Sequence, residues 1–214
     1  MAKLKIFTFP DLVLTQKAAP IARVEKSMYR LADDMLETMY GAPGIGLAAN
    51  QVGILQRLLV IDTDYDYEEL PEGVSAPEGV EVFGGGIVQN RKPQIIINPE
   101  IFYKEGSILF SEGCLSVPEY SAEVKRSEKI KLRYQDIDGL THELAADGLL
   151  AIAIQHEMDH LEGKLFIDRL SPLKKELARK RLRKERQERE SEDIFAEPIK
   201  QGKLGKPKPK RKGF

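Results

Sequence analysis

The sequence predicts an α+β fold in which antiparallel or mixed sheets pack around a central helix, followed by a charged C-terminal helix and a tail. Apolar residues recur at helical spacing in residues 25–40, and a second helical pattern covers 148–162. Between these regions lie short segments rich in β-branched residues, which is the composition of strands. A chain of 214 residues with 42% hydrophobic and 31% charged residues is long enough to bury one sizeable core.

The first predicted helix covers residues 25–40. Its apolar residues recur every three or four positions with charged residues between them, and they are Val24, Met28, Leu31, Met35, Leu36 and Met39. This spacing is typical of a helix with one buried face. The turn-forming residues Gly41-Ala42-Pro43-Gly44 end it, and a second glycine pair follows in Gly44-Ile45-Gly46.

Five segments are predicted as strands: Arg57–Asp62, Gln94–Asn98, Ser107–Phe110, Lys129–Gln135 and Thr141–Leu144. The last two are joined by an Asp138-Gly139 turn. Residues 63–93, here called the acidic insertion, are rich in acidic residues, Pro and Gly. We expect them to form a long connection, mobile or hairpin-like, that is inserted into the sheet.

The second predicted helix runs from Gly148 to about Glu162, with Asp147 as its N-cap and Gly163 after its end. Apolar residues surround it on all sides, so we expect it to be central. Residues 171–193 are predicted to form a highly charged helix with sparse apolar positions, and 194–214 a basic, disordered tail. We therefore expect one folded domain over residues 1–170.

The charge is divided unevenly along the chain. Residues 1–170 contain 17 Lys+Arg and 27 Asp+Glu, a net charge of −10, whereas residues 171–214 contain 16 and 7, a net charge of +9. A basic end of this kind is typical either of a segment that binds a polyanion or of a solvated, solubilising one. A single cysteine, Cys114, fits a reducing compartment, and no signal peptide or membrane-spanning segment is apparent, so we expect a cytoplasmic protein.

The segment from His156 to His160 has the pattern H-E-x-x-H. Histidines four residues apart on a helix project from one side, close enough to bind one metal ion. Glu157 lies about 100° round the helix, beside such an ion without needing to ligate it. The pattern also occurs by chance, but two of the chain's three histidines lie here, and an apolar wall shares their face: Leu149, Ile152 and Ala153. The central helix is therefore predicted to bind a metal.

A catalytic ion needs a third protein ligand and an open position for water. In the extended protease pattern H-E-x-x-H-x-x-G-x-x-H the third ligand would fall at Phe166, which cannot ligate. Asp168 lies past the helix-ending glycine and is better explained as a solvated or capping acid. Cys114 is the best remaining ligand, although a free cysteine is often a small buried hydrophobe. Its neighbour Gly113 would let the backbone approach another group closely.

Three motifs together resemble, in order and spacing, the signature motifs of bacterial peptide deformylases of type I. They are Gly44-Ile45-Gly46-Leu47-Ala48-Ala49-Asn50-Gln51, Glu112-Gly113-Cys114-Leu115-Ser116 and Gln155-His156-Glu157-Met158-Asp159-His160. The early Phe9-Pro10-Asp11-Leu12-Val13-Leu14 also resembles the start of that family. The likeness covers residues 1 to about 172.

The resemblance implies a hydrolase that removes the formyl group from N-terminal formylmethionine of nascent polypeptides and releases formate. It implies that Cys114, His156 and His160 bind one divalent metal ion, with Glu157 as the general acid/base. Gln51 and the backbone N–H of Leu115 would bind the oxyanion. A substrate strand would lie along Gly46, and Ile45, Leu149 and Ile152 would form the methionine pocket, although each of these apolar residues could equally be ordinary core.

The resemblance implies Fe(II) as the physiological ion, with Zn(II), Ni(II) or Co(II) able to substitute, whereas the two-His, one-Cys ligand set alone favours zinc. Two other readings stay open: a metallopeptidase of the H-E-x-x-H class, and a metal-stabilised module that binds ribosomes or RNA. Family members dock a C-terminal helix on the ribosome near the tunnel exit, and the basic C-terminal segment is expected to do so here. We expect no binding to membranes or DNA.

Overall fold

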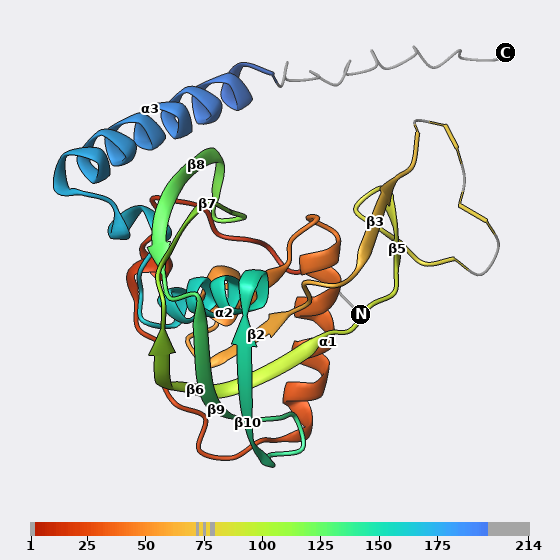
Figure 1. Ribbon diagram of the computed structural model, residues 1–214. Helices are drawn as coiled ribbons and strands as arrows, with labels where there is room; N and C mark the ends of the chain where they lie inside the picture. The colour runs from red at the N-terminus through yellow and green to blue at the C-terminus, as the bar shows by residue number, and fades with distance from the viewer. Residues whose placement is uncertain (1–2, 72, 75, 78–79, 197–214) are drawn as a thin grey trace, which may run out of the picture.

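The computed structural model describes residues 3–71, 73–74, 76–77 and 80–196, and these form an α+β fold (Figure 1). The helices are α1 (Lys26–Tyr40), α2 (Gly148–Leu161) and α3 (Pro172–Ala196), with short 3₁₀ helices η1 (Leu12–Thr15), η2 (Ala49–Val52) and η3 (Phe166–Arg169). Most of the tail expected for 194–214 lies outside the described residues. Among those residues, no helix combines the length and the apolar composition that a membrane span needs.

The strands form three antiparallel sheets. The five-stranded sheet has the order β1-β2-β6-β9-β10, with β1 (Gly46–Ala48), β2 (Leu58–Ile61), β6 (Gln94–Glu105), β9 (Lys129–Gln135) and β10 (Thr141–Asp147). The acidic insertion contributes a small sheet of order β3-β5-β4, with β3 (Asp66–Glu69), β4 (Val82–Phe83) and β5 (Gly86–Gln89). A two-stranded ribbon pairs β7 (Ile108–Cys114) with β8 (Val117–Arg126).

The two faces of the five-stranded sheet are covered by α2 and α1, as the contacts of β2 show. Its four residues are all buried, and they point alternately to opposite faces. Leu59 and Ile61 belong to the same hydrophobic cluster as Ile154 of α2, whereas Leu58 and Val60 pack with Met35 and Met39 of α1. The continuous apolar run that predicted this strand therefore reflects a strand between two helical layers.

Helix α2 lies across the middle of the molecule, between the sheet and the β7–β8 ribbon (Figure 1). It is buried along most of its length, as its apolar composition predicted. Asp147 is its N-cap residue, but the Asp147 side chain makes no capping hydrogen bond. A third hydrophobic cluster joins β8, η3 and α3 through residues that include Val124, Phe166 and Leu182.

The predicted strands differ from the observed ones mainly in length. Strand β6 extends to Glu105, β7 to Cys114 and β10 to Asp147. Strands β1 and β8 were not expected. The acidic insertion, predicted to be mobile or hairpin-like, contains antiparallel strand pairs and packs against α1 through Tyr65 and Phe83, which contact the ring of Tyr40.

Candidate metal centre and active site

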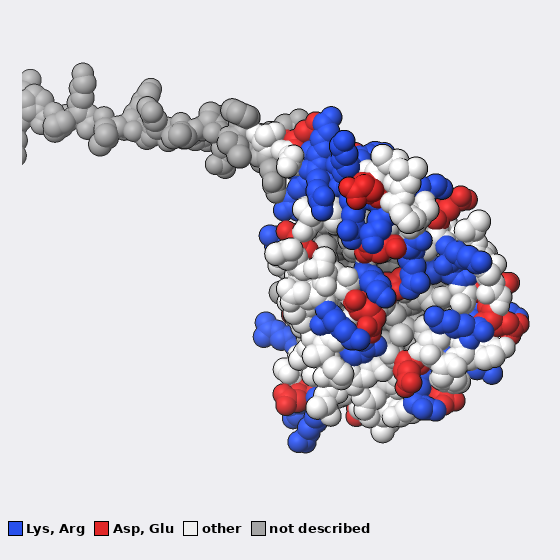
Figure 2. Space-filling view, turned by 90° about the vertical axis from the view of Figure 1, so that its left-hand side faces the viewer, with Lys and Arg blue, Asp and Glu red and all other residues white. Residues whose placement is uncertain are grey.

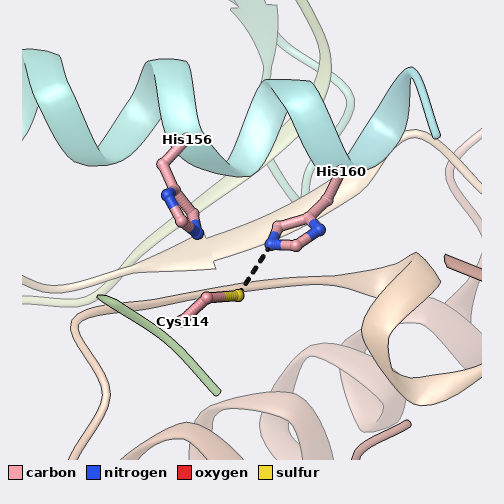
Figure 3. Close-up of side chains that lie close together, drawn as sticks. All are labelled: Cys114, His156 and His160. Atoms are coloured by element: carbon pink, nitrogen blue, oxygen red, sulfur yellow. Dashed lines mark hydrogen bonds between the residues drawn. The ribbon is translucent and has the colours of Figure 1, made fainter. Parts of the chain in front are cut away.

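His156 and His160 project from one side of α2 toward Cys114 (Figure 3), and His156 lines a cavity beside them. The opposite side of α2 packs on the sheet through residues such as Ile154 and Leu161, which turns the two imidazoles away from the sheet. Both histidines are buried, and their ring centroids lie 5.0 Å apart.

Cys114 reaches the histidines from the end of β7. A register shift between Glu112 and Cys114 interrupts the pairing with β8 at this point. The Sγ atom of Cys114 lies 3.2 Å from Nε2 of His160 (Figure 3), and the ligand atoms of the three residues lie within 4.8 Å of one another. A Cβ on Gly113 would meet no protein atom within 4 Å, and Gly113 lines the cavity.

The three donors fit a divalent transition metal. Thiolate and imidazole are ligands that zinc and iron share, and three of them leave a coordination position for water. Burial lowers the pKa of His160, which keeps that ring in the neutral form that can ligate. Burial opposes the charged form of His156, but Cys114 and Glu112 outweigh it and raise the pKa of His156. The negative groups therefore favour a positive charge at the place where the ion would be bound.

Glu157 lies beside this cluster with its side chain buried, and it lines the cavity. Burial raises the pKa of Glu157 to about 7, and its Oε2 atom has no hydrogen-bond partner among the described residues. A Cβ on Gly46 would lie 2.5 Å from Oε1 of Glu157, so any larger residue at that position in β1 would displace the Glu157 carboxylate. A buried carboxyl group with a pKa near neutrality is suited to accept a proton and return it.

Gln51 presents its amide nitrogen to the same cluster. Its Oε1 atom accepts a hydrogen bond from the backbone N–H of Ala48 over 2.8 Å, which fixes the orientation of the amide. Its Nε2 atom then lies 3.1 Å from Oγ of Ser116 and 3.6 Å from Sγ of Cys114. Leu115 lines the same cavity. Hydrogen-bond donors beside a metal site can stabilise a developing oxyanion.

A cavity of about 360 Å³ opens beside the cluster. The structure brings all of the predicted pocket residues to its wall: Ile45, Gly46, Leu149 and Ile152. Pro43 and Phe110 also line it, and the sequence analysis did not identify them.

A network of buried charges behind His156 was also missed. The Nδ1–H group of His156 donates to Oε2 of Glu112 over 2.8 Å, and Arg126 binds both carboxylate oxygens of Glu112 at 2.6 and 2.8 Å. Arg126 also donates to Asp159 over 2.6 Å, and Asp159 pairs with Arg169. Glu112 and Asp159 lie inside the quoted motifs, so the motifs could have suggested them; nothing local in the sequence points to Arg126.

Phe166 and Asp168, the two positions considered above as a third metal ligand, have other roles in the structure. Phe166 is buried and stacks on the ring of His156 at 6.0 Å between centroids. Asp168 accepts a hydrogen bond from the backbone N–H of Leu165 and pairs with Lys175 and Arg179, so it acts as a capping acid, as predicted.

Comparisons with known proteins agree on one family. The family model described as polypeptide deformylase matches residues 3–176. Peptide deformylase 2 of Xanthomonas axonopodis pv. citri is 48% identical over 189 residues, which covers 87% of this chain and 98% of that protein. The peptide deformylase of Zymomonas mobilis is 49% identical over 191 residues, with 89% of this chain and 98% of that protein covered.

Solved structures show the same relationship. A peptide deformylase from Legionella pneumophila superposes with a TM-score of 0.72 at 37% identity. The match covers 92% of this chain and 100% of that chain. A peptide deformylase from Ehrlichia chaffeensis in complex with actinonin has a TM-score of 0.70 at 38% identity, covering 86% of this chain and 98% of that one.

Proposed function

The chain belongs to the polypeptide deformylase family, and from this premise we propose how its own residues carry out the reaction. The enzyme hydrolyses the amide between a formyl group and the N-terminal methionine of a polypeptide, and it releases formate. The observation that carries this function is that the Cys114–His156–His160 cluster lies beside Glu157 at a cavity that Cys114, His156 and Glu157 line.

Cys114, His156 and His160 would hold the ion. A divalent metal in such a site makes bound water a nucleophile near neutral pH and polarises a carbonyl oxygen. Glu157 takes a proton from the attacking water as its oxygen bonds to the formyl carbon. The Gln51 amide and the backbone N–H of Leu115 donate to the oxygen that becomes negative. Glu157 then gives the proton to the amine as the C–N bond breaks, so formate and a free amino terminus leave.

The cavity binds the methionine side chain in this proposal. Ile45, Leu149 and Ile152 supply apolar walls, and the backbone at Gly46 lies along the peptide. Leu149 and Ile45 are partly exposed, at 41% and 37%, so they lie at the mouth of the cavity.

An assay for free formate on a formyl-Met peptide tests this function directly. We expect formate in proportion to new amino termini and no internal peptide fragments. Fragments without formate would instead indicate a metallopeptidase, which the structure does not favour because Phe166 packs on His156 where that class would need a ligand.

We propose one Fe(II) ion as the physiological metal, with Zn(II), Ni(II) or Co(II) able to replace it. Support comes from the thiolate ligand, which borderline metals accept, and from the family. Metal analysis of protein prepared without oxygen, coupled to the formate assay, tests this proposal. An active enzyme that holds only zinc under those conditions would contradict it.

We also propose residues 1–170 as the catalytic domain of a cytoplasmic protein, with 171–193 and the tail as the segment that meets the ribosome near the tunnel exit. Figure 2 shows Lys and Arg side chains gathered on α3 and across the middle of the same face, with acidic side chains among them. Ala178 and Leu182 hold α3 on the domain, which leaves Lys174 and Lys180 exposed.

Truncation at Ser171 would expose that packed surface, so a charge change is the cleaner test. We expect Lys174→Gln with Lys180→Gln to reduce co-sedimentation with ribosomes at low salt, because polyanion binding depends on cations. Replacing Lys26 and Lys131, which are exposed on other elements, is the matched control. Equal sedimentation of both double variants and the parent would contradict docking by α3.

A further inference from the structure

The acidic insertion packs against the loop that forms one wall of the active-site cavity. The wall residues are Pro43, Gly44, Ile45 and Gly46. Tyr65, which is not one of the cavity-lining residues, donates its hydroxyl to the carbonyl oxygen of Gly44 over 3.1 Å. Gly84 lies so close to Gly41 that a Cβ on Gly84 would be 2.0 Å from the Gly41 carbonyl oxygen. This loop is therefore held between the acidic insertion and the cavity.

Asp62 fixes the base of the acidic insertion to the same loop. Its backbone N–H donates to the carbonyl oxygen of Ile45 over 3.0 Å. Its buried carboxylate accepts hydrogen bonds from the Tyr40 hydroxyl at 2.7 Å and from the backbone N–H groups of Lys92 at 2.7 Å and Asp64 at 3.1 Å. One carboxylate thus joins both ends of the acidic insertion to the end of α1.

The loop that contains Gly44 and Gly46 packs closely against side chains that face the cavity. A Cβ on Gly44 would lie 2.8 Å from Cδ1 of Leu115, and one on Gly46 would lie 2.5 Å from Oε1 of Glu157. Since real Cβ contacts are longer than this, the loop already touches the groups that face the reaction. A shift of Gly44 would therefore change the width of the cavity and not only the outer surface.

We propose that Tyr65 is a positioning residue for substrate binding: its hydroxyl holds Gly44, and through it Ile45 and Gly46, at the distance from Leu115 that the formyl-Met peptide requires. This inference rests on the proposed function, which supplies the substrate. The ring of Tyr65 packs edge-on against Tyr40 at 5.0 Å between centroids, so the hydroxyl has a fixed direction. Burial raises the pKa of Tyr65, so the hydroxyl stays a donor at neutral pH.

The test is Tyr65→Phe, which removes the hydroxyl and keeps the ring. We expect KM for a formyl-Met peptide to rise about two- to tenfold, the effect of one hydrogen bond. We expect kcat and metal content to stay unchanged, because the wall contacts the substrate equally before and during the reaction. The matched control is Tyr67→Phe: the Tyr67 ring also packs in the cluster around α1, but its hydroxyl has no hydrogen-bond partner among the described residues.

A binding measurement separates this inference from the proposed function. In the metal-loaded Glu157→Gln background, Tyr65→Phe should raise the dissociation constant of the formyl-Met peptide by the same factor as KM, and Tyr67→Phe should not. Equal constants for the two variants would overturn the positioning role. A fall in kcat and thermal stability with KM unchanged would also overturn it, since the bond would then be structural only. Absence of formate release by the parent enzyme would contradict the proposed function. The dissociation constants of Tyr65→Phe and Tyr67→Phe for the peptide would still test the role of Tyr65.

Discussion

Arg126 is a buried cation whose partners are all part of the active site or next to it. Its side chain is only 2% exposed, and it binds Glu112 on one side and Asp159 on the other. Buried charges are tolerated when they are paired and hydrogen-bonded, as here. Because Glu112 accepts from Nδ1–H of His156, the network leaves Nε2 of that ring for the ion.

The Glu112→Gln variant should bind metal more weakly. The amide keeps the size of the carboxylate but loses the charge that orients His156, and changes of this kind lower metal affinity about 10- to 100-fold. Competition with a chelator measures the affinity. Glu119→Gln is the control, because Glu119 is exposed and its ion pair with Arg189 is long, at 3.8 Å. Equal affinity for both variants would show that the network has no influence on the ion.

Replacing Glu157 should separate chemistry from metal binding. Glu157→Ala is expected to keep stoichiometric metal, because Glu157 is not among the three ligands, and to lose about 100- to 10,000-fold in deformylation rate. Formate release and metal analysis on the same preparation measure the two properties. Full turnover by this variant would remove Glu157 from the proton transfers.

At the scale of elements, α3 is attached to the domain by a narrow stripe. Ala178 and Leu182, four residues apart, are buried against η3 and β8, whereas Leu173 and Leu177 on the same helix are 71% and 58% exposed. Arg186 adds a hydrogen bond of 2.7 Å to the hydroxyl of Thr8. The sparse apolar positions of the sequence are therefore enough to dock a mostly polar helix.

Leu182→Ala should destabilise the protein by about 2–5 kcal/mol, the usual effect of emptying a buried leucine site. Leu177→Ala is the matched control, and we expect it to change stability by less than about 0.5 kcal/mol because that side chain is exposed. Denaturant unfolding of both variants provides the comparison. Similar losses in the two would mean that α3 contributes no packing through Leu182.

Elements with a continuous local pattern could be predicted, and elements defined by pairing could not. The spacing of Met28, Met35 and Met39 predicted α1, and the run from Leu58 to Ile61 predicted β2. Strand β8 begins at Val117-Pro118 and contains Glu119 at a φ of 59°, so its local signals oppose a strand and only its pairing with β7 defines it. The strands of the acidic insertion are likewise identified by their pairing with one another.

In the candidate site, too, residues on one helix could be predicted from the sequence, whereas residues brought together by tertiary contacts could not. His156, Glu157 and His160 share one helix, so helical geometry alone places them together. Their link to Cys114 came from the resemblance and from the lack of another ligand. Arg126 depends on how β8 lies against α2, and Tyr65 depends on how the acidic insertion folds back on Gly44; neither distance is encoded in a local pattern.

For the whole molecule, the metal centre lies where the three hydrophobic clusters meet. Helix α2 belongs to the cluster on one face of the sheet, Leu115 packs against the cluster around α1, and Cys114 packs against the cluster under α3. An ion bound by Cys114, His156 and His160 would therefore connect the β7–β8 ribbon to the central helix.

Removal of the ion should lower the melting temperature. A ligand that binds only the folded state adds about 2.7 kcal/mol when its concentration is 100 times its dissociation constant, which in a protein of this size is about 5–10 °C. Calorimetry of the metal-loaded protein before and after chelation measures the difference, and adding the metal back should restore it. Identical melting temperatures would show that the three ligands do not hold an ion in the folded chain.

The way α2 ends has a consequence for the local stability of the turn that carries His160. Its last turn accepts a hydrogen bond from Ala18 at the Leu161 carbonyl, and Gly163 fits so tightly that a Cβ there would lie 2.5 Å from the Thr15 carbonyl oxygen. At the other end, β10 continues into α2 through Gly148. The C-terminal end of α2 is therefore held by the segment from Thr15 to Ala18, whereas its first turn carries the exposed Leu149. The backbone amides around His160 should therefore exchange with solvent hydrogen more slowly than the amides of that first turn.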